Sequence, residues 1–135
     1  MKYLRQRGFT LVECTVVCAM ALIMAAVAVP SYQGHARRAA RMDAVQALTR
    51  VQATQEQFRS LHGLYAAELQ VLRGVMPVSD QGHYTLALSP AGPDGYRVTA
   101  HARGGQAQDR ECAALTLDVR QGFATQGPST KCWNQ

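Results

Sequence analysis

Residues 9–29 read FTLVECTVVCAMALIMAAVAV, 21 residues in which Glu13 carries the only charged side chain. A helix of that length spans roughly 30 Å, which matches the hydrocarbon thickness of a bilayer. An ionisable group in such a segment is costly and usually has a partner or a function. The stretch therefore predicts a membrane-spanning helix in which Glu13 has a specific role.

The eight residues in front of this run, MKYLRQRG, contain three basic side chains and no acidic one. A basic flank is typical of the cytoplasmic side of a membrane helix, although three arginines also follow the far end of the run. A secretory signal peptide usually has a shorter apolar core and a small-residue cleavage site, and here Pro30 follows instead. We therefore expect a retained helix with its N-terminus in the cytoplasm.

The chain as a whole has 135 residues and a formal charge of +5, with 17% charged and 47% hydrophobic residues. This length predicts one small domain and excludes a multidomain machine. The composition excludes a disordered or low-complexity tail, so the part after the apolar run is expected to contain a core.

The stretch Gly8-Phe9-Thr10-Leu11-Val12-Glu13, between a short basic leader and the long apolar run, resembles the class III signal of type IV pilins and the related pseudopilins. The resemblance implies that a prepilin peptidase of the inner membrane cuts between Gly8 and Phe9 and N-methylates the new Phe9 amine. Pro30 falls where pilins commonly have a helix-bending proline.

Cleavage would remove three of the 14 basic residues, which leaves 11 basic against 9 acidic residues and a net charge of +2. Glu13 lies one helical turn from the new Phe9 amine, and opposite charges attract strongly where the dielectric constant is low. In a fibre of staggered subunits, Glu13 of an incoming subunit would pair with the Phe9 amine of its neighbour. The alternative is that Glu13 neutralises its own terminus.

Cys14 and Cys18 lie in the same run, four residues apart and so on one helix face. Parallel side chains on one helix are poorly placed for a mutual disulfide. We interpret both as small apolar filler. Metal binding or lipidation is the alternative, and nothing else in the sequence supports it.

Residues 31–62 remain compatible with a helix and contain one glycine, Gly34. Their apolar side chains recur three to seven positions apart, which is amphipathic spacing, with Gly63 as the stop. The expected apolar stripe is Val45, Leu48, Val51, Phe58 and Leu61.

Charged residues of this segment, including Arg41 and Asp43, are expected mostly on other faces of the helix. Arg37, Arg38 and Arg41 form an RRxxR stretch, which we interpret as a solvated face rather than as a site for lipid headgroups or nucleic acid.

Residues 63–135 show alternating apolar patterns that predict three strands, around residues 84–88, 96–100 and 115–119, with a short fourth at 123–125. A Pro/Gly-rich turn at 90–95 joins the first two strands, and the polar loop 104–111 joins the next two. The predicted class is α+β, a long N-terminal helix packed on a small antiparallel β-sheet, which is the type IV pilin fold.

The end of the chain, with Leu115-Thr116-Leu117-Asp118, Gly122 and Cys132-Trp133, resembles the C-terminal half of PilE-type minor pilins. In that family two cysteines bracket a loop, and Cys112 and Cys132 are the cysteines of this chain outside the apolar run. A head beyond the inner membrane would lie in an oxidising compartment, so we expect a Cys112–Cys132 disulfide worth about 3 kcal/mol.

No motif for catalysis or metal binding is recognisable in the sequence. There is no G-x-S-x-G, no H-E-x-x-H, no C-x-x-C and no phosphate-binding glycine loop, and the four histidines are far apart. We therefore expect a protein that is not an enzyme and that has no catalytic residue, no metal and no cofactor.

The prediction from sequence is a structural minor pilin that is assembled into the type IV pilus or primes it, in pilus biogenesis, twitching motility and adhesion. It divides the chain into leader 1–8, fibre-core helix 9–30, amphipathic half 31–62 and β head 63–135 with the disulfide loop 112–132. Expected partners are major and minor pilins, prepilin peptidase, the inner-membrane assembly platform and inner-membrane lipid. Expected locations are the inner membrane, crossed once with a periplasmic head, and then the surface fibre.

Two alternatives stay open. One is a DNA-binding minor pilin for DNA uptake, with Arg97, Arg103 and Arg110 as contacts, because cations bind the phosphate backbone. The other is a pseudopilin of a type II secretion system, which shares the N-terminal signal.

Overall fold

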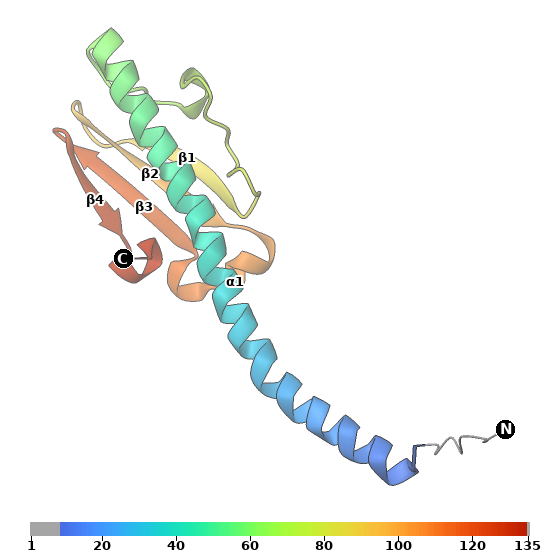
Figure 1. The fold of residues 1–135 in the computed structure, drawn as a ribbon. Coiled ribbons are helices and arrows are strands. Elements are labelled where there is room, and N and C mark those ends of the chain that lie inside the picture. Colours follow the sequence, from blue (N-terminus) through green and yellow to red (C-terminus); the bar gives the residue numbers. More distant parts are fainter. Residues whose placement is uncertain (1–8, 135) are drawn as a thin grey trace. The chain divides into compact units, whose positions relative to one another are not determined.

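A computed structural model describes residues 9–134. A long helix, α1 (Leu11–His62), is followed by a four-stranded antiparallel sheet (Figure 1). The predicted α+β class and the packing of a helix on a small sheet are confirmed. The predicted leader 1–8, including the cleavage residue Gly8, lies outside the described residues. By its internal contacts the chain divides into two compact units, with the boundary between His35 and Ala36.

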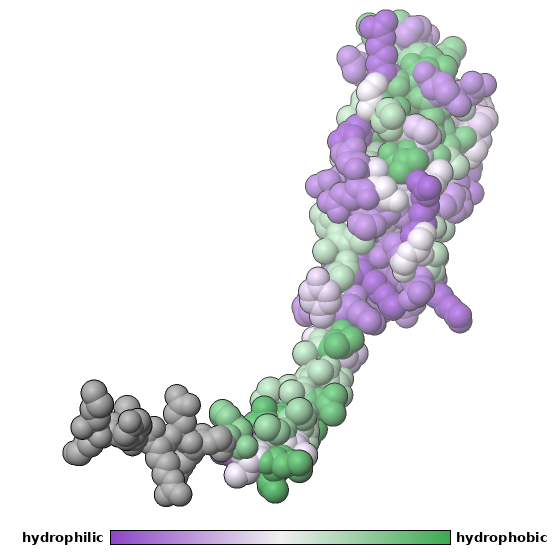
Figure 2. All heavy atoms as spheres, turned by 90° about the vertical axis from the view of Figure 1, so that its right-hand side faces the viewer, coloured by the Kyte–Doolittle hydropathy of each residue, from purple (hydrophilic) through white to green (hydrophobic). Residues whose placement is uncertain are grey.

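The first unit contains the N-terminal part of α1. By length and composition, α1 includes a stretch long and apolar enough to cross a membrane. Its side chains from Phe9 to His35 are exposed, and the face of this segment seen in Figure 2 is mostly hydrophobic. The helix continues through Pro30 and Gly34. The bend expected at Pro30 stays a prediction.

The second unit, from Ala36 on, is the head, and its sheet is a meander in the order β1-β2-β3-β4. The strands are β1 (Tyr84–Pro90), β2 (Gly95–Ala102), β3 (Ala114–Arg120) and β4 (Phe123–Gly127). In the first three strands alternate side chains are buried, as the sequence pattern predicts for a sheet with one covered face. Consecutive strands pair in an antiparallel register, such as Val98 with Leu117.

Two turns depend on glycine. Gln121 and Gly122, which join β3 to β4, have φ values of 50° and 83°, as a two-residue hairpin of type I′ requires. At Gly95 a Cβ atom would lie 2.6 Å from the carbonyl oxygen of Val119. Only glycine lets β2 approach β3 at that point.

The core lies between the second half of α1 and the sheet. Ala44, Leu48 and Val51 of α1 are fully buried, together with Tyr84, Tyr96, Val98 and Leu115 of the sheet. The small side chains Ala40, Ala44 and Ala47 fall on the same helix face and let α1 lie close to the strands. Tyr96 packs edge-on against Tyr65, with 4.9 Å between ring centroids.

The sequence predicted the buried face of α1 wrongly at both an apolar and two charged positions. Leu61 is 74% exposed, because the helix continues beyond the core at its C-terminal end. Arg41 and Asp43, expected on other faces, are only 6% and 2% exposed. Both are buried because loops far away in the sequence supply their polar partners.

The connection between α1 and β1 contains one short 3-10 turn, η1 (Leu69–Val71). The start of this connection is held to the helix by Gln55, which is fully buried. The Gln55 amide donates to the carbonyl oxygen of Ala66 and accepts from the Ala66 N–H, both at 2.9 Å. Because this pair of hydrogen bonds satisfies both backbone groups of Ala66, as a neighbouring strand would, it fixes the start of the connection.

Candidate functional site

The start of α1 holds Glu13 in a capping box. The Thr10 N–H donates to Glu13 Oε2 at 3.2 Å, and the Glu13 N–H donates to Thr10 Oγ1 at 3.3 Å. This reciprocal pair satisfies backbone donors that the first helical turn leaves free. The Glu13 carboxylate therefore lies at the helix start, in the same turn as Phe9.

Thr10 is a residue whose local role the sequence interpretation missed. The signal was present, because Thr10-Leu11-Val12-Glu13 follows the S/T-x-x-E pattern of a capping box. Cys14 and Cys18 are free and exposed in the same segment.

A second site forms where the disulfide joins two loops of the head. Cys112 and Cys132 are bonded, with their Cα atoms 5.4 Å apart. The bond links η3 (Arg110–Cys112), which follows η2 (Gly104–Gln108), to η4 (Thr130–Trp133) near the C-terminus. We call residues 103–112 and 130–134, which contain these three turns, together with residues 37–41 of α1, the loop junction. Figure 1 shows the turns gathered beside the helix at one end of the sheet.

A buried ion pair fastens the loop junction to α1. Arg41 Nε lies 2.7 Å from Asp109 Oδ2, and Arg41 Nη2 lies 2.9 Å from Oδ1. The two side chains are only 7% and 8% exposed. The bond to Asp109 raises the pKa of Arg41 against the opposing effect of burial. Such two-pronged pairing combines charge with a fixed geometry.

Further polar contacts surround this pair. Arg41 Nη1 donates to the carbonyl oxygen of Lys131 at 3.3 Å. The amide of Gln106 donates to the carbonyl oxygen of Arg37 and to the hydroxyl of Tyr84, at 3.2 and 3.0 Å. Asn134 donates to the carbonyl oxygen of Arg38 at 3.1 Å. One turn of α1 is therefore bound by both loops that the disulfide connects.

Asp43 is a buried carboxylate whose hydrogen bonds within residues 9–134 all come from neutral donors. It accepts from the hydroxyl of Ser79 at 2.5 Å and from the backbone N–H groups of Gln81 and His83 at 3.1 and 3.3 Å. These donors belong to the turn that leads into β1. Asp43 therefore determines where the sheet begins relative to the helix.

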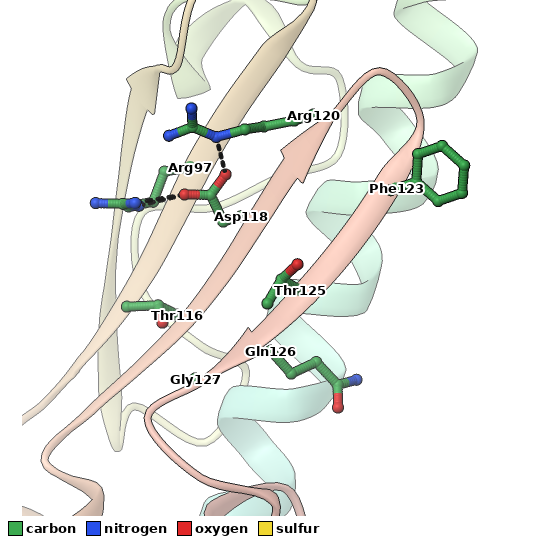
Figure 3. Close-up of a pocket in the computed structure, with 8 residues that line it drawn as sticks. All are labelled: Arg97, Thr116, Asp118, Arg120, Phe123, Thr125, Gln126 and Gly127. Carbon is green, nitrogen blue, oxygen red and sulfur yellow. Dashed lines mark hydrogen bonds and ion pairs between the residues drawn. The ribbon is translucent and has the colours of Figure 1, made fainter.

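The outer face of the sheet carries an exposed group of charges (Figure 3). Asp118 on β3 accepts from Arg97 on β2, with 2.8 Å to Nε, and from Nε of Arg120 at 3.0 Å. Together, the bonds from Arg97 and Arg120 lower the pKa of Asp118. A shallow, open pocket beside them is lined by Thr116, Thr125 and Gln126, with Phe123 at its rim.

The three arginines predicted as DNA contacts do not share one environment. Arg97 is bound to Asp118 on the sheet face. Arg103 and Arg110 are exposed, at the start of η2 and in η3, and within residues 9–134 neither forms an ion pair. Of these three arginines, Arg103 and Arg110 lie in the loop junction without a carboxylate partner, whereas Arg97 does not.

Among the residues that the structure describes, no three histidine, cysteine or acidic side chains lie together as metal ligands would. What the described sites offer is charge and hydrogen bonding. They fix the helix start, bind the loops to α1 and present free arginines.

A long apolar N-terminal helix that continues into a helix packed on an antiparallel sheet, with a disulfide near the C-terminus, defines a type IV pilin fold. The family described as "Type IV minor pilin ComP, DNA uptake sequence receptor" matches residues 30–116, and the prokaryotic N-terminal methylation motif matches residues 3–29. The chain belongs to the type IV minor pilin family.

A relative among characterised proteins is the "Prepilin peptidase-dependent protein D" of Escherichia coli strain K12. It is 45% identical over 42 residues, which is 31% of this chain. The chain matches 29% of that relative's length. Pilin families are structural, and the apolar helix with the methylation motif fits anchoring in a membrane and assembly into a pilus.

Proposed function

We propose that this protein is a minor subunit of a type IV pilus, without enzymatic activity. It is made as a precursor that crosses the bacterial inner membrane once with its head in the periplasm. It is cut between Gly8 and Phe9 by prepilin peptidase and methylated on Phe9. The inner-membrane assembly platform then builds it into the fibre, or uses it to prime the fibre, beside other pilins.

The observation that carries this proposal is the position of Glu13. It lies in an apolar helix that matches the N-terminal methylation motif, and Thr10 holds its carboxylate at the helix start. In a low-dielectric setting a carboxylate at that place attracts a positive amine strongly. This supports Glu13 as the assembly residue, which pairs with the Phe9 amine of a neighbouring subunit.

The proposed division of labour follows the chain. Residues 1–8 are the cleaved leader, 9–30 the segment for the membrane and fibre core, 31–62 the amphipathic half of the helix, and 63–135 the β part of the head with the disulfide loop 112–132. Fibre functions such as twitching motility and adhesion belong to the assembled pilus.

The test is quantitative mass spectrometry of fibres sheared from cells. We expect this chain in a small ratio to the most abundant pilin, with an N-terminal peptide that begins at methylated Phe9. If fibres are present without this chain, the proposal is wrong and a secretion pseudopilin becomes the better interpretation.

A variant tests the assembly role of Glu13 in the same cells. Glu13→Gln keeps the size of the side chain but removes the charge, so we expect the processed chain to accumulate in the membrane and to be lost from fibres. Glu68→Gln is the matched control, because it removes an exposed carboxylate of the head. Equal incorporation of Glu13→Gln and wild type into fibres would show that the Glu13 charge has no role in assembly.

A second candidate function is binding of DNA for uptake. It is favoured by the description of the matched family as a DNA uptake sequence receptor, together with the exposed Arg103 and Arg110. Each phosphate contact contributes roughly 0.9 to the slope of log affinity against log salt. For the full chain in detergent micelles we expect Arg103→Gln/Arg110→Gln to weaken duplex binding and to lower that slope by about 2.

The control for this experiment is Arg97→Gln/Arg120→Gln, which removes the same charge from the sheet face. Equal loss in both variants would indicate a general charge effect. No binding of the wild type at low salt would remove the DNA candidate.

A further inference from the structure

The positive charge of the head is concentrated in one region. The loop junction, with residues 37–41, 103–112 and 130–134, contains six basic and two acidic residues, a net charge of +4. The remainder of the chain from Ala36 on contains five basic and six acidic residues, a net charge of −1. The excess therefore belongs to the loop junction alone.

Two of these six cations are neutralised within the junction. Arg41 is bound to Asp109, and Lys131 lies 2.5 Å from Glu111. The other four are Arg37, Arg38, Arg103 and Arg110, and we call them the basic collar. None of them forms an ion pair with a carboxylate within residues 9–134. Arg37 is partly exposed and the other three are exposed.

The tertiary structure brings the two halves of the collar together. Arg37 Nη2 donates to the side chain of Gln108 at 3.4 Å, and Gln106 donates back to the Arg37 carbonyl oxygen. Gln106 and Gln108 both belong to η2, which Arg103 precedes and Arg110 follows. The Arg41–Asp109 pair holds this loop against the helix, and the disulfide joins the loop to η4.

The chain also places the collar close to the end of the apolar run. Arg37 follows Val29 by only eight residues of the chain. Headgroup layers add several ångströms to each side of the hydrocarbon region. Arginine side chains are long, and attraction to a charged surface acts over a Debye length of roughly 8 Å at physiological salt.

We propose that the basic collar binds the anionic phospholipid headgroups of the membrane that the apolar helix spans. The four guanidinium groups would donate to lipid phosphates, as arginine does wherever phosphate is recognised. The contact would hold the head on the membrane surface before the subunit enters a fibre. This inference rests on the proposed membrane-bound precursor.

The test uses the full-length chain in lipid nanodiscs, where no second subunit is present. The discs contain phosphatidylcholine alone or with about one third phosphatidylglycerol. Hydrogen–deuterium exchange is followed in peptides covering residues 103–112, which are distant in sequence from the leader and its own basic residues. We expect slower exchange in the anionic discs than in the neutral ones and a loss of the difference in high salt.

Variants locate the effect. Each basic side chain near an anionic surface changes association by roughly fivefold. Arg37→Gln/Arg38→Gln and Arg103→Gln/Arg110→Gln should therefore each weaken the lipid-dependent protection by about 25-fold. The control Arg50→Gln/Arg73→Gln removes the same charge from exposed positions outside the collar and should keep it. The near-ultraviolet signal of Trp133 verifies that each variant is folded.

Equal exchange in neutral and anionic discs overturns the proposal, and so does an equal loss in the control variant. Protection by added duplex DNA without an effect of phosphatidylglycerol also overturns it and assigns the collar to DNA. These outcomes leave the proposed membrane stage intact. A chain that fails to enter the discs through its apolar helix would instead contradict the proposed function itself.

Discussion

The head contains two arginine–aspartate sites of similar chemistry and opposite setting. In the loop junction, Arg41 and Asp109 are 7% and 8% exposed and join α1 to a loop 68 residues away. On the sheet face, Arg97 is 51% exposed and bonds to Asp118 on the neighbouring strand, together with Arg120. Exposed pairs contribute 1 kcal/mol or less, as a rule, whereas breaking a buried pair leaves a charge in a poor solvent. Burial, rather than the pairing itself, decides which site the fold depends on.

The largest effect is expected from removing the buried carboxylate. Asp109→Ala leaves the Arg41 guanidinium buried without its partner and should lower the free energy of unfolding by about 3–5 kcal/mol. Urea unfolding of the full chain in detergent, followed by Trp133 fluorescence, measures this. Asp118→Ala is the matched control and should cost less than about 1 kcal/mol. Similar losses in both variants would contradict the comparison.

A double variant tests whether the loss in Asp109→Ala comes from the unpaired buried charge of Arg41. Arg41→Met/Asp109→Leu replaces both charges by apolar side chains, which is often neutral for a buried pair. We expect it to recover most of the stability that Asp109→Ala loses. Failure to recover would indicate that Arg41 and Asp109 hold the loop through geometry that apolar side chains cannot supply.

The disulfide should rank next. Cys112→Ala/Cys132→Ala frees the loop that the bond closes and should cost about 3 kcal/mol by the chain-entropy estimate. The same urea titration applies. Reductant should destabilise the wild type by a similar amount and leave the double variant unchanged; a large effect of reductant on the variant would point to Cys14 and Cys18 instead.

Asp43 is buried without an ion pair, because its bonds come from uncharged groups. Its replacement therefore measures how much stability burial contributes without ion pairing. Asp43→Ala removes the acceptor for Ser79, Gln81 and His83 and should cost about 2–3 kcal/mol, between the two arginine sites. Exchange of backbone amides at residues 81–84 should rise with it. A loss as small as that of Asp118→Ala would mean that water replaces the carboxylate.

The smallest expected effect is the pH dependence of the sheet-face site. Arg97 and Arg120 lower the pKa of Asp118 below its usual value of about 3.9. These ion pairs therefore stabilise the fold above about pH 4, and that contribution is lost as the pH falls through the lowered pKa. The stability difference between wild type and Asp118→Asn should be below about 1 kcal/mol at pH 7 and vanish near pH 2. A difference that grows in acid would reverse this assignment.

Much of the molecule could be predicted from local patterns. Twenty-one residues with one charge predict a membrane-length helix, alternation predicts the buried faces of β1 to β3, and Gly63 ends α1 with a φ of 76°. The roles of Arg41 and Asp43 were predicted wrongly. Arg41 was assigned to a solvated face and Asp43 to a face away from the apolar stripe, and both are buried because their partners come from distant loops.

The sequence by itself determined the class of this protein. The apolar run, the Thr10–Glu13 capping box and the strand pattern each depend on neighbours within a few residues, where spacing alone sets the geometry. The tertiary structure decided which arginine of the RRxxR stretch is buried and which are free to bind another molecule. Arg37, Arg38 and Arg41 lie on one helix and have the same chemistry. Their roles differ because one loop brings Asp109 to Arg41 and also brings Arg103 and Arg110 to the same junction.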